Sequence, residues 1–450
     1  MNVIKLLLVL SISYISAILI IYSPTIIILG LFFFILSIYL YYKNFEGFLL
    51  FVLLLCFDFA NLFPTIGQFH TYDLLFPLLF LSLGEIIISK KKKSNFCYDD
   101  LKHFNFFAGM FSVFVVLAIL GIFIAYLNEN QPLIYGLRGA RRYFFILFYF
   151  VVKFNSLNIN KLKNYVINFS LLLCLLNLMQ YFLYNKINIF YIEAGMRAGT
   201  LRFFGGYPIV VLGIFFIFAK FIRYRKIKDL LIFLVLFIIS SSLIKARMIM
   251  FGILIAVVMI SFRTRIINIR NILFFFISAI LILFMYFGIL QNQYQYKDYM
   301  YYKIIYETKN EIKYSEGNWL VRLKEYNYFL KYWMENPLFG RGIYTSTYSE
   351  SIETQGIAFG YYLSDLGWFS ILYEFGLIGL FWAIVLIVYI LKRVYIYQYY
   401  EMEIYVYFVI STLVTMNFFL LSHTVLVPAF FASMFYNYTL TFQKSNITYA

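Results

Sequence analysis

Arginine side chains gather on three short polar connections of this chain, where together they could hold an anionic ligand. A guanidinium group is a planar fork of donors that binds phosphate oxygens in pairs. A single arginine at a helix end is usually an anchor whose charged head reaches water. Seven cations on three separate connections fit that explanation less well, so we predict a site for a phosphate-bearing ligand. The seven are Arg138, Arg141, Arg142, Arg197, Arg202, Lys245 and Arg247.

Two carboxylates near the C-terminus are the candidates for acid–base chemistry. Asp365 precedes an apolar segment, and Glu374 lies nine residues further on, inside it. At about 100° per residue the two side chains point to opposite faces of a helix, so we do not expect a dyad. Asp365 is placed for chemistry in water. Glu374 is a candidate because carboxylates inside membrane spans are usually functional, with a hydrogen-bonded packing contact as the alternative. No histidine or cysteine has a metal-ligand spacing, so we expect neither metal nor cofactor.

The composition indicates what must position these residues. Of the 450 residues, 63% are hydrophobic and only 13% are charged, with a mean hydropathy of +0.82. A soluble domain carries about 25% charged residues, so we expect an all-α polytopic integral membrane protein with about 12–14 transmembrane helices. The candidate spans lie near 5–22, 25–42, 48–61, 73–89, 105–127, 136–155, 165–184, 207–222, 229–244, 247–262, 271–290, 367–391, 404–421 and 425–442.

The basic residues predict the orientation of these spans. The block Lys90–Lys93 indicates a cytoplasmic loop, and alternation from there places both termini in the cytoplasm. The net charge of +16 is then mostly a topology signal and not a surface for nucleic acid. We expect an N-terminal bundle of about 11 spans over 1–290, one large external (periplasmic) loop over 291–366, and about three spans over 367–450.

The large external loop contains a predicted amphipathic helix and a tight turn. Residues 318–334 carry leucine and aromatic side chains at helical spacing, with Arg322 on a polar face. The helix should end near Asn336, because the residue before a proline is biased away from helical geometry. Two glycines then flank Arg341 and permit a turn that presents it.

Several short patterns resemble the O-antigen polymerase and O-antigen ligase superfamily. The sequence ENPLFGRG (335–342) resembles the family's NPLxGxG turn, and Gly376 with Gly379 resembles its GxxG. Counting back from Gly376 places Asp365 where ligases carry a histidine. Arg202 opens an arginine-x10-glycine pattern of polymerase external loops. The missing histidine favours a polymerase of the Wzy type.

For a Wzy-type polymerase, the resemblance implies glycosyl transfer between undecaprenyl-diphosphate-linked oligosaccharides at the periplasmic face of the bacterial inner membrane. The product would be O-antigen, capsule or another surface glycan. The implied enzyme is a metal-independent glycosyltransferase, with a chain-length regulator and a flippase as further partners. Two alternatives stay open: an O-antigen ligase that transfers glycan to lipid A core, and a lipid-linked oligosaccharide flippase or transporter.

Residue roles follow from the same resemblance. Asp365 would orient or deprotonate the acceptor hydroxyl, and Arg197 and Arg202 would neutralise the leaving diphosphate. Arg341 would join them from the large loop as part of a lid. The other implied diphosphate-binding residues are Arg138, Arg141, Arg142 and Arg247, and the further candidates are Glu374, Lys245 and Arg322.

Overall fold

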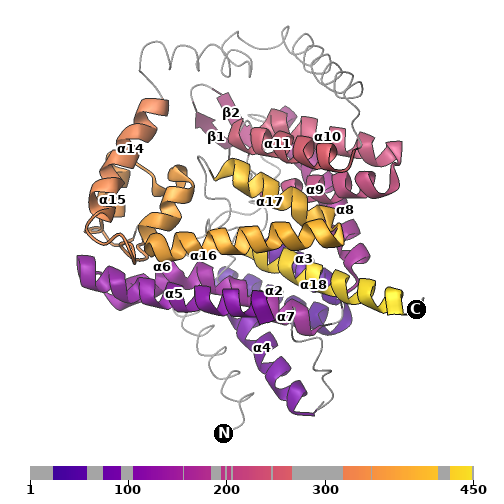
Figure 1. Ribbon diagram of the computed structural model, residues 1–450, viewed down its shortest axis with the longest axis horizontal. Helices are drawn as coiled ribbons and strands as arrows, with labels where there is room; N and C mark the ends of the chain where they lie inside the picture. The colour runs from indigo at the N-terminus through magenta and orange to yellow at the C-terminus, as the bar shows by residue number, and fades with distance from the viewer. Residues whose placement is uncertain are drawn as a thin grey trace.

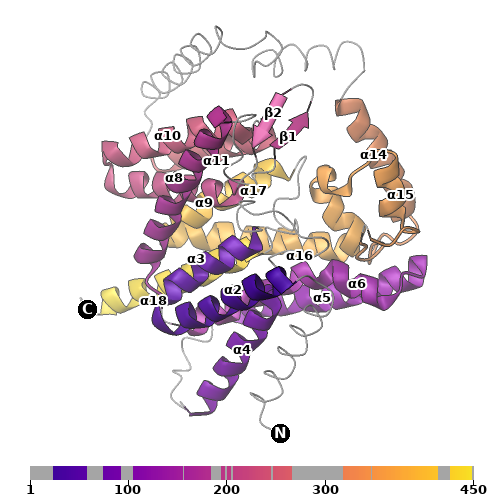
Figure 2. The same cartoon turned by 180° about the vertical axis from the view of Figure 1, so that it is seen from behind.

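The structure, a computed structural model, is a bundle of α-helices that also contains a short β hairpin (Figures 1 and 2). It describes residues 24–57, 74–92, 105–155, 157–183, 194–197, 200–203, 206–244, 247–265, 318–345, 347–413 and 426–447. The predicted all-α membrane fold is confirmed, while the expected spans at 5–22 and 271–290 lie outside the described residues.

The first half of the chain contributes these elements: α2 (Pro24–Lys43), α3 (Phe45–Cys56), α4 (Leu75–Lys92), α5 (Asn105–Glu129), α6 (Leu133–Ala140), the 3₁₀ helix η4 (Arg141–Leu147), α7 (Phe148–Phe154) and α8 (Ile159–Leu183). The second half contributes these: β1 (Ala194–Arg197), β2 (Thr200–Phe203), α9 (Tyr207–Tyr224), α10 (Ile227–Ile244), α11 (Arg247–Arg263), α14 (Asn318–Trp333), α15 (Ile352–Ala358), the 3₁₀ helix η7 (Leu363–Leu366), α16 (Trp368–Tyr397), α17 (Tyr400–Thr412) and α18 (Leu426–Ile447).

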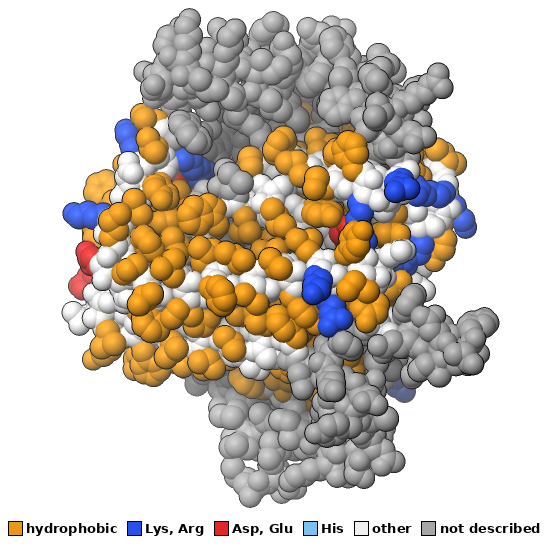
Figure 3. Space-filling model, in the orientation of Figure 1, with side chains coloured by type: hydrophobic (Ala, Val, Ile, Leu, Met, Phe, Trp, Pro, Cys, Tyr) orange, Lys and Arg blue, Asp and Glu red, His pale blue; other side chains and the backbone are white. Residues whose placement is uncertain are grey.

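Within the described residues, four helices are long and apolar enough to cross a membrane, by length and composition. They are Phe106–Glu129, α8, α9 and α16. At 1.5 Å per residue the 25 residues of α8 extend about 37 Å, which exceeds a hydrocarbon core of about 30 Å. Hydrophobic side chains cover the middle of the face in Figure 3, and charged side chains lie toward its two sides. Exposed apolar residues such as Leu127 on α5 and Phe381 on α16 suit a surface that faces lipid.

Two segments differ from the helices that we predicted. The expected single span at 136–155 is a succession of α6, η4 and α7, in which seven residues take the tighter 3₁₀ form. The expected external loop at 197–208 overlaps the antiparallel hairpin β1–β2, which covers 194–203. Both departures concern segments that carry the predicted cations.

Ion pairs join several helices at the end of the bundle where α16 finishes. Glu401 of α17 pairs with Lys163 of α8 and with Arg223 of α9, the latter at 3.4 Å. Glu403 pairs with Arg263 of α11, which also donates to a backbone carbonyl near the C-terminal end of α16 (2.9 Å). These basic residues come from regions that the charge pattern assigns to one side of the membrane. The structure gathers them at one end, and their cytoplasmic orientation stays a prediction.

Candidate functional site

Helix α16 breaks at Gly376, and the turn from ENPLFGRG fills the break. Gly376 has φ 66° and ψ −165°, so the helical hydrogen-bond ladder cannot continue across it. Lipid offers no hydrogen bonds, and the freed backbone groups of a membrane helix must find partners in the protein. The turn provides four: Arg341 N–H to Tyr373 O (2.7 Å), Gly342 N–H to Glu374 O (3.2 Å), Leu377 N–H to Pro337 O (3.0 Å) and Ile378 N–H to Leu338 O (3.3 Å). We call this unit of 335–342 and 373–378 the turn–helix junction.

Two glycines allow the backbones of the junction to approach each other this closely. A Cβ on Gly376 would lie 2.1 Å from the carbonyl oxygen of Leu338, and one on Gly340 would lie 2.5 Å from the nitrogen of Gly376. Gly340 also has φ 76°, which L side chains rarely adopt. The sequence patterns NPLxGxG and GxxG are therefore the two sides of one contact.

The turn also docks on the end of α5. The backbone N–H of Ile343 donates to the carbonyl of Gly121 (3.0 Å). Asn128 donates from its side chain to the carbonyl of Arg341 (3.2 Å), and Gln131 donates to that of Ile343 (3.0 Å). The junction thus holds α5 and α16 together.

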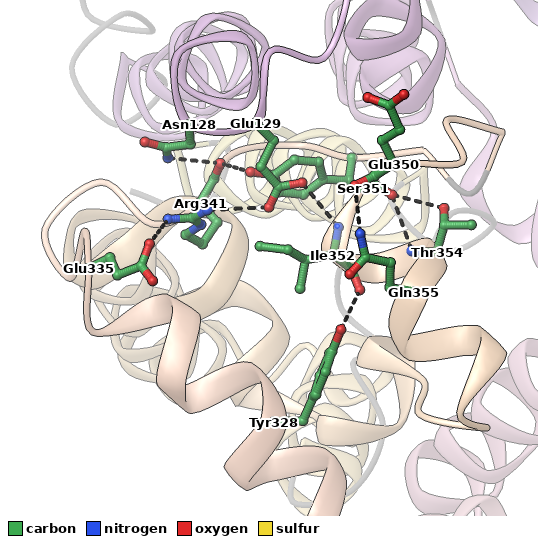
Figure 4. A network of polar contacts seen from close by, with 11 residues as sticks. Asn128, Glu129, Tyr328, Glu335, Arg341, Glu350, Ser351, Ile352, Thr354 and Gln355 are labelled. Carbon is green, nitrogen blue, oxygen red and sulfur yellow. Dashed lines mark hydrogen bonds and ion pairs between the residues drawn. The ribbon is translucent and has the colours of Figure 1, made fainter.

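Arg341 lies buried between two carboxylates and is not presented on an open face (Figure 4). Its guanidinium pairs with Glu335 at 2.5 Å and with Glu129 of α5 at 3.4 Å. Glu129 also accepts a hydrogen bond from the backbone N–H of Ile352 (3.1 Å), which begins α15. One acid therefore ties the turn to α15, and a contact between Arg341 and a diphosphate would require these ion pairs to open.

We expect Glu129→Gln to loosen α15 while the bundle stays folded. A hydrogen bond to a charged group contributes about 1.5–3 kcal/mol, and the neutral amide would weaken those to Arg341 and Ile352. Limited proteolysis should then cut within residues 345–362 faster than in the wild type. Glu350→Gln, the same change at an exposed position of the loop, is the control. Equal cleavage rates in the two variants would contradict this role of Glu129.

A second buried ion pair connects η4 with α16 beside the junction. Arg142 lies 3.1 Å from Glu374 and donates to the hydroxyl of Tyr143 (2.9 Å), which donates in turn to the second oxygen of Glu374. The side chain of Glu374 is 7% exposed and that of Arg142 is 28% exposed. Glu374 is therefore a paired carboxylate held by an arginine of the predicted cation set.

Glu353, in the first turn of α15, is a carboxylate that sequence reasoning missed. Among the described residues it has no hydrogen-bond partner, although its charge interacts with Glu374, Arg142 and Glu129. Packing around the side chain raises the pKa of its carboxyl from 4.5 to about 7. Desolvation is the largest cause, repulsion by Glu374 and Glu129 adds to it, and attraction by Arg142 opposes it.

The structure places the other predicted residues in different surroundings. Asp365 of η7 pairs with Arg322 of α14 at 2.5 Å, and Arg322 also pairs with Glu325 at 3.0 Å. The side chain of Asp365 is 30% exposed. Arg138 is exposed, with its guanidinium 5.8 Å from the centre of the Tyr135 ring.

The remaining predicted cations lie on the hairpin and around it. Arg202 pairs in register with Gly195, and Arg197 pairs with Thr200. Arg141 is the partly exposed first residue of η4, Arg247 begins α11, and Lys245 lies outside the described residues.

Glu129 and Tyr143 were also missed, although the sequence carries a weak signal for each. Glu129 closes an otherwise apolar span, which is an unusual place for an acid, and Tyr143 follows two arginines in an aromatic run. Glu353 had none, because one glutamate in a polar loop resembles any solvated residue. Glu353 differs from a solvated residue because the fold places it near Glu374, Glu129 and Arg142.

The described part of the chain is thus a membrane-embedded helical bundle with a polar cap over one end. The cap comprises residues 318–366 (Figure 1), and its Arg341 meets Glu129 of the bundle (Figure 4). This architecture defines a membrane-embedded helical protein with a cluster of paired charged residues at one end of its described helices.

Residues 230–384, about a third of the chain, match the Wzy_C family, described as O-antigen ligase. The matched segment runs from α10 into α16 and contains both sides of the junction. The segment is therefore similar to the O-antigen polymerase and ligase superfamily, which confirms the resemblance predicted from the short motifs. No curated protein matches the chain. The match supports a function of the polysaccharide polymerase or ligase kind, and with it an enzymatic role.

Proposed function

We propose that this protein is a Wzy-type polymerase that joins lipid-diphosphate-linked oligosaccharides by glycosyl transfer. The observation that carries the proposal is the turn–helix junction, which unites two patterns of the superfamily beside paired arginine and carboxylate groups. A polymerase is preferred to a ligase because Asp365 stands where ligases carry a histidine. Arg322 forms an ion pair with Asp365, which stabilises a carboxylate at this position.

In the proposed reaction, the growing glycan moves from its lipid diphosphate to a hydroxyl of the incoming lipid-linked unit. Diphosphate is a good leaving group, so this transfer needs neither a nucleotide sugar nor a metal. Cationic donors accelerate it by stabilising the charge that develops on the leaving oxygens. We assign that role to Arg197, Arg202, Arg138, Arg141 and Arg247, with Asp365 orienting the acceptor side of the cap.

The proposed setting is the periplasmic face of the bacterial inner membrane. The lipid carrier is undecaprenyl diphosphate, and a flippase must deliver the repeat units to that face. A chain-length regulator is the second proposed partner.

Alanine substitutions test the residue roles. We expect Arg197→Ala, Arg202→Ala and Asp365→Ala each to lose the long-chain glycan ladder in cells that lack the chromosomal copy. Removing one such donor lowers the rate on the order of 10²–10³-fold in characterised sites. Lys324→Ala, which removes an exposed cation from α14, is the control. Normal ladders for all three variants at normal protein level would show that the assignments are wrong.

The deletion strain distinguishes the candidate functions. Loss of a polymerase leaves lipid A core carrying one repeat unit, which is our expected result. Loss of a ligase, the activity in the family's description, leaves unmodified core. Loss of a flippase retains lipid-linked units on the cytoplasmic side of the membrane. Either of the last two results would contradict the proposed polymerase.

A further inference from the structure

The site contains more carboxylates than cations. Glu374 is paired with Arg142, and Glu129 is paired with Arg341. Glu353 lies near enough to interact with both acids and with Arg142, yet the described residues offer its carboxylate no hydrogen bond. A partly exposed carboxylate without a partner can accept a proton or a hydrogen bond from a ligand.

A buried donor without a partner lies close to the same carboxylate. Tyr373 of α16 is fully buried, and no described residue is hydrogen-bonded to its hydroxyl. The charge of Glu353 acts on that hydroxyl. Buried polar groups are nearly always satisfied by protein, water or ligand. A sugar hydroxyl suits this place, because its oxygen can accept from Tyr373 while its proton is donated to Glu353.

The cap fixes the position of Glu353 from two sides. Ser351 caps α15 by accepting from the backbone N–H of Thr354 (3.1 Å), and Glu129 of α5 holds the N–H of Ile352 (Figure 4). The hydroxyl of Tyr328 on α14 donates to the carbonyl of Ile352 (3.2 Å). The first turn of α15 is therefore fixed by contacts with α14 and with α5. A group that acts on a substrate atom needs such a fixed position.

We propose that Glu353 is the catalytic general base that takes the proton from the acceptor sugar hydroxyl. The inference rests on the proposed glycosyl transfer. The acceptor O–H bond breaks and its proton moves to the Glu353 carboxylate. The acceptor oxygen forms a bond to the anomeric carbon of the donor, whose bond to the diphosphate oxygen breaks with both electrons leaving on the lipid diphosphate. Glu353 then returns its proton to water. Asp365, held by Arg322, is a positioning residue of the cap.

The proton affinity of Glu353 predicts the pH dependence of the rate. A base must be deprotonated to act, and the pKa of this carboxyl is raised to about 7. The rate should therefore fall about tenfold per pH unit below about 7 and level off above it. The titratable and charged groups around Glu353 are Glu374 and Tyr373 of α16, Arg142 of η4, Glu129 of α5 and Tyr328 of α14.

The test compares Glu353→Gln with the wild type in the full-length protein, reconstituted with lipid-diphosphate-linked repeat units from the deletion strain. We expect the rate to fall on the order of 10²–10⁴-fold. We also expect the decrease in rate below about pH 7, which is the acid limb of the pH–rate profile, to disappear. Glu353→Asp, which keeps a carboxylate, should recover part of the rate and keep a pH limb. Glu350→Gln in the same loop should match the wild type, and Asp365→Asn should keep the limb at its place.

The outcomes separate the base from the proposed function. If the wild type makes no polymer from any repeat unit, the polymerase proposal fails. If the wild type polymerises and Glu353→Gln does so at the same rate and with the same limb, Glu353 is not the base. Disappearance of the limb in Asp365→Asn, with its retention in Glu353→Gln, would overturn the assignment in favour of Asp365. Should Glu353→Gln fail to fold, a Glu353→Ala variant that keeps the wild-type rate and the wild-type fall in rate below about pH 7 would also overturn the assignment.

Discussion

Replacing Gly376 with alanine is expected to destabilise the folded protein by about 4 kcal/mol and to remove most of it from the membrane. The residue has φ 66° and ψ −165°, a region almost restricted to glycine, and another residue there costs about 1–3 kcal/mol. Its Cβ would also lie 2.1 Å from the carbonyl oxygen of Leu338. Backbone atoms must then move apart, weakening four hydrogen bonds that each contribute about 0.5–1.5 kcal/mol.

Gly360, which lies in the cap, distinguishes the effect of the steric clash from that of the backbone strain. Gly360 has φ 77°, but nothing lies within 4 Å of the position that a Cβ would take there, so Gly360→Ala should cost only about 1–2 kcal/mol. The measurement is the thermal unfolding midpoint of purified protein in detergent, with the yield of folded protein beside it. Equal midpoints for Gly376→Ala and Gly360→Ala would show that the junction does not hold α16 as described.

Arg142→Ala is expected to cost about 3 kcal/mol, because it strands the carboxylate of Glu374 inside the protein. Breaking a buried ion pair from one side typically costs about 3–5 kcal/mol. We take the lower end of that range because the side chain of Arg142 is still 28% exposed, whereas that of Glu374 is 7% exposed. Tyr143 would keep its hydrogen bond to Glu374 but cannot replace the positive charge.

A double substitution tests whether the loss arises from the unpaired charge. Arg142→Ala combined with Glu374→Gln removes both charges and should be more stable than Arg142→Ala alone. Arg138→Ala, four residues earlier and exposed, should change stability by less than about 1 kcal/mol. Chemical unfolding of the wild type and these three variants in detergent provides the comparison. A double variant less stable than Arg142→Ala would mean that the two side chains act independently.

Much of the fold was predictable because it depends on local pattern. The amphipathic segment predicted at 318–334 is α14 (Asn318–Trp333), and the turn after it contains glycines with positive φ on both sides of Arg341. The change to 3₁₀ form at Arg141 was not predictable, since apolar spacing does not distinguish it from a continuous α-helix. The short hairpin at 194–203 was missed for a similar reason, because the spans around it dominate the pattern.

The sequence by itself determined the membrane class, the helical elements and the superfamily of the segment with the two glycine motifs. Composition, periodicity and short motifs are properties of neighbouring residues, so they can be read without a fold. Only the tertiary structure decided which charges meet: Arg142 with Glu374, 232 residues apart, and Arg341 with Glu129, 212 residues apart. It also left Glu353 without a hydrogen-bond partner among the described residues beside them. Such pairings depend on how distant helices pack, and each buried charge takes the partner that packing brings within reach.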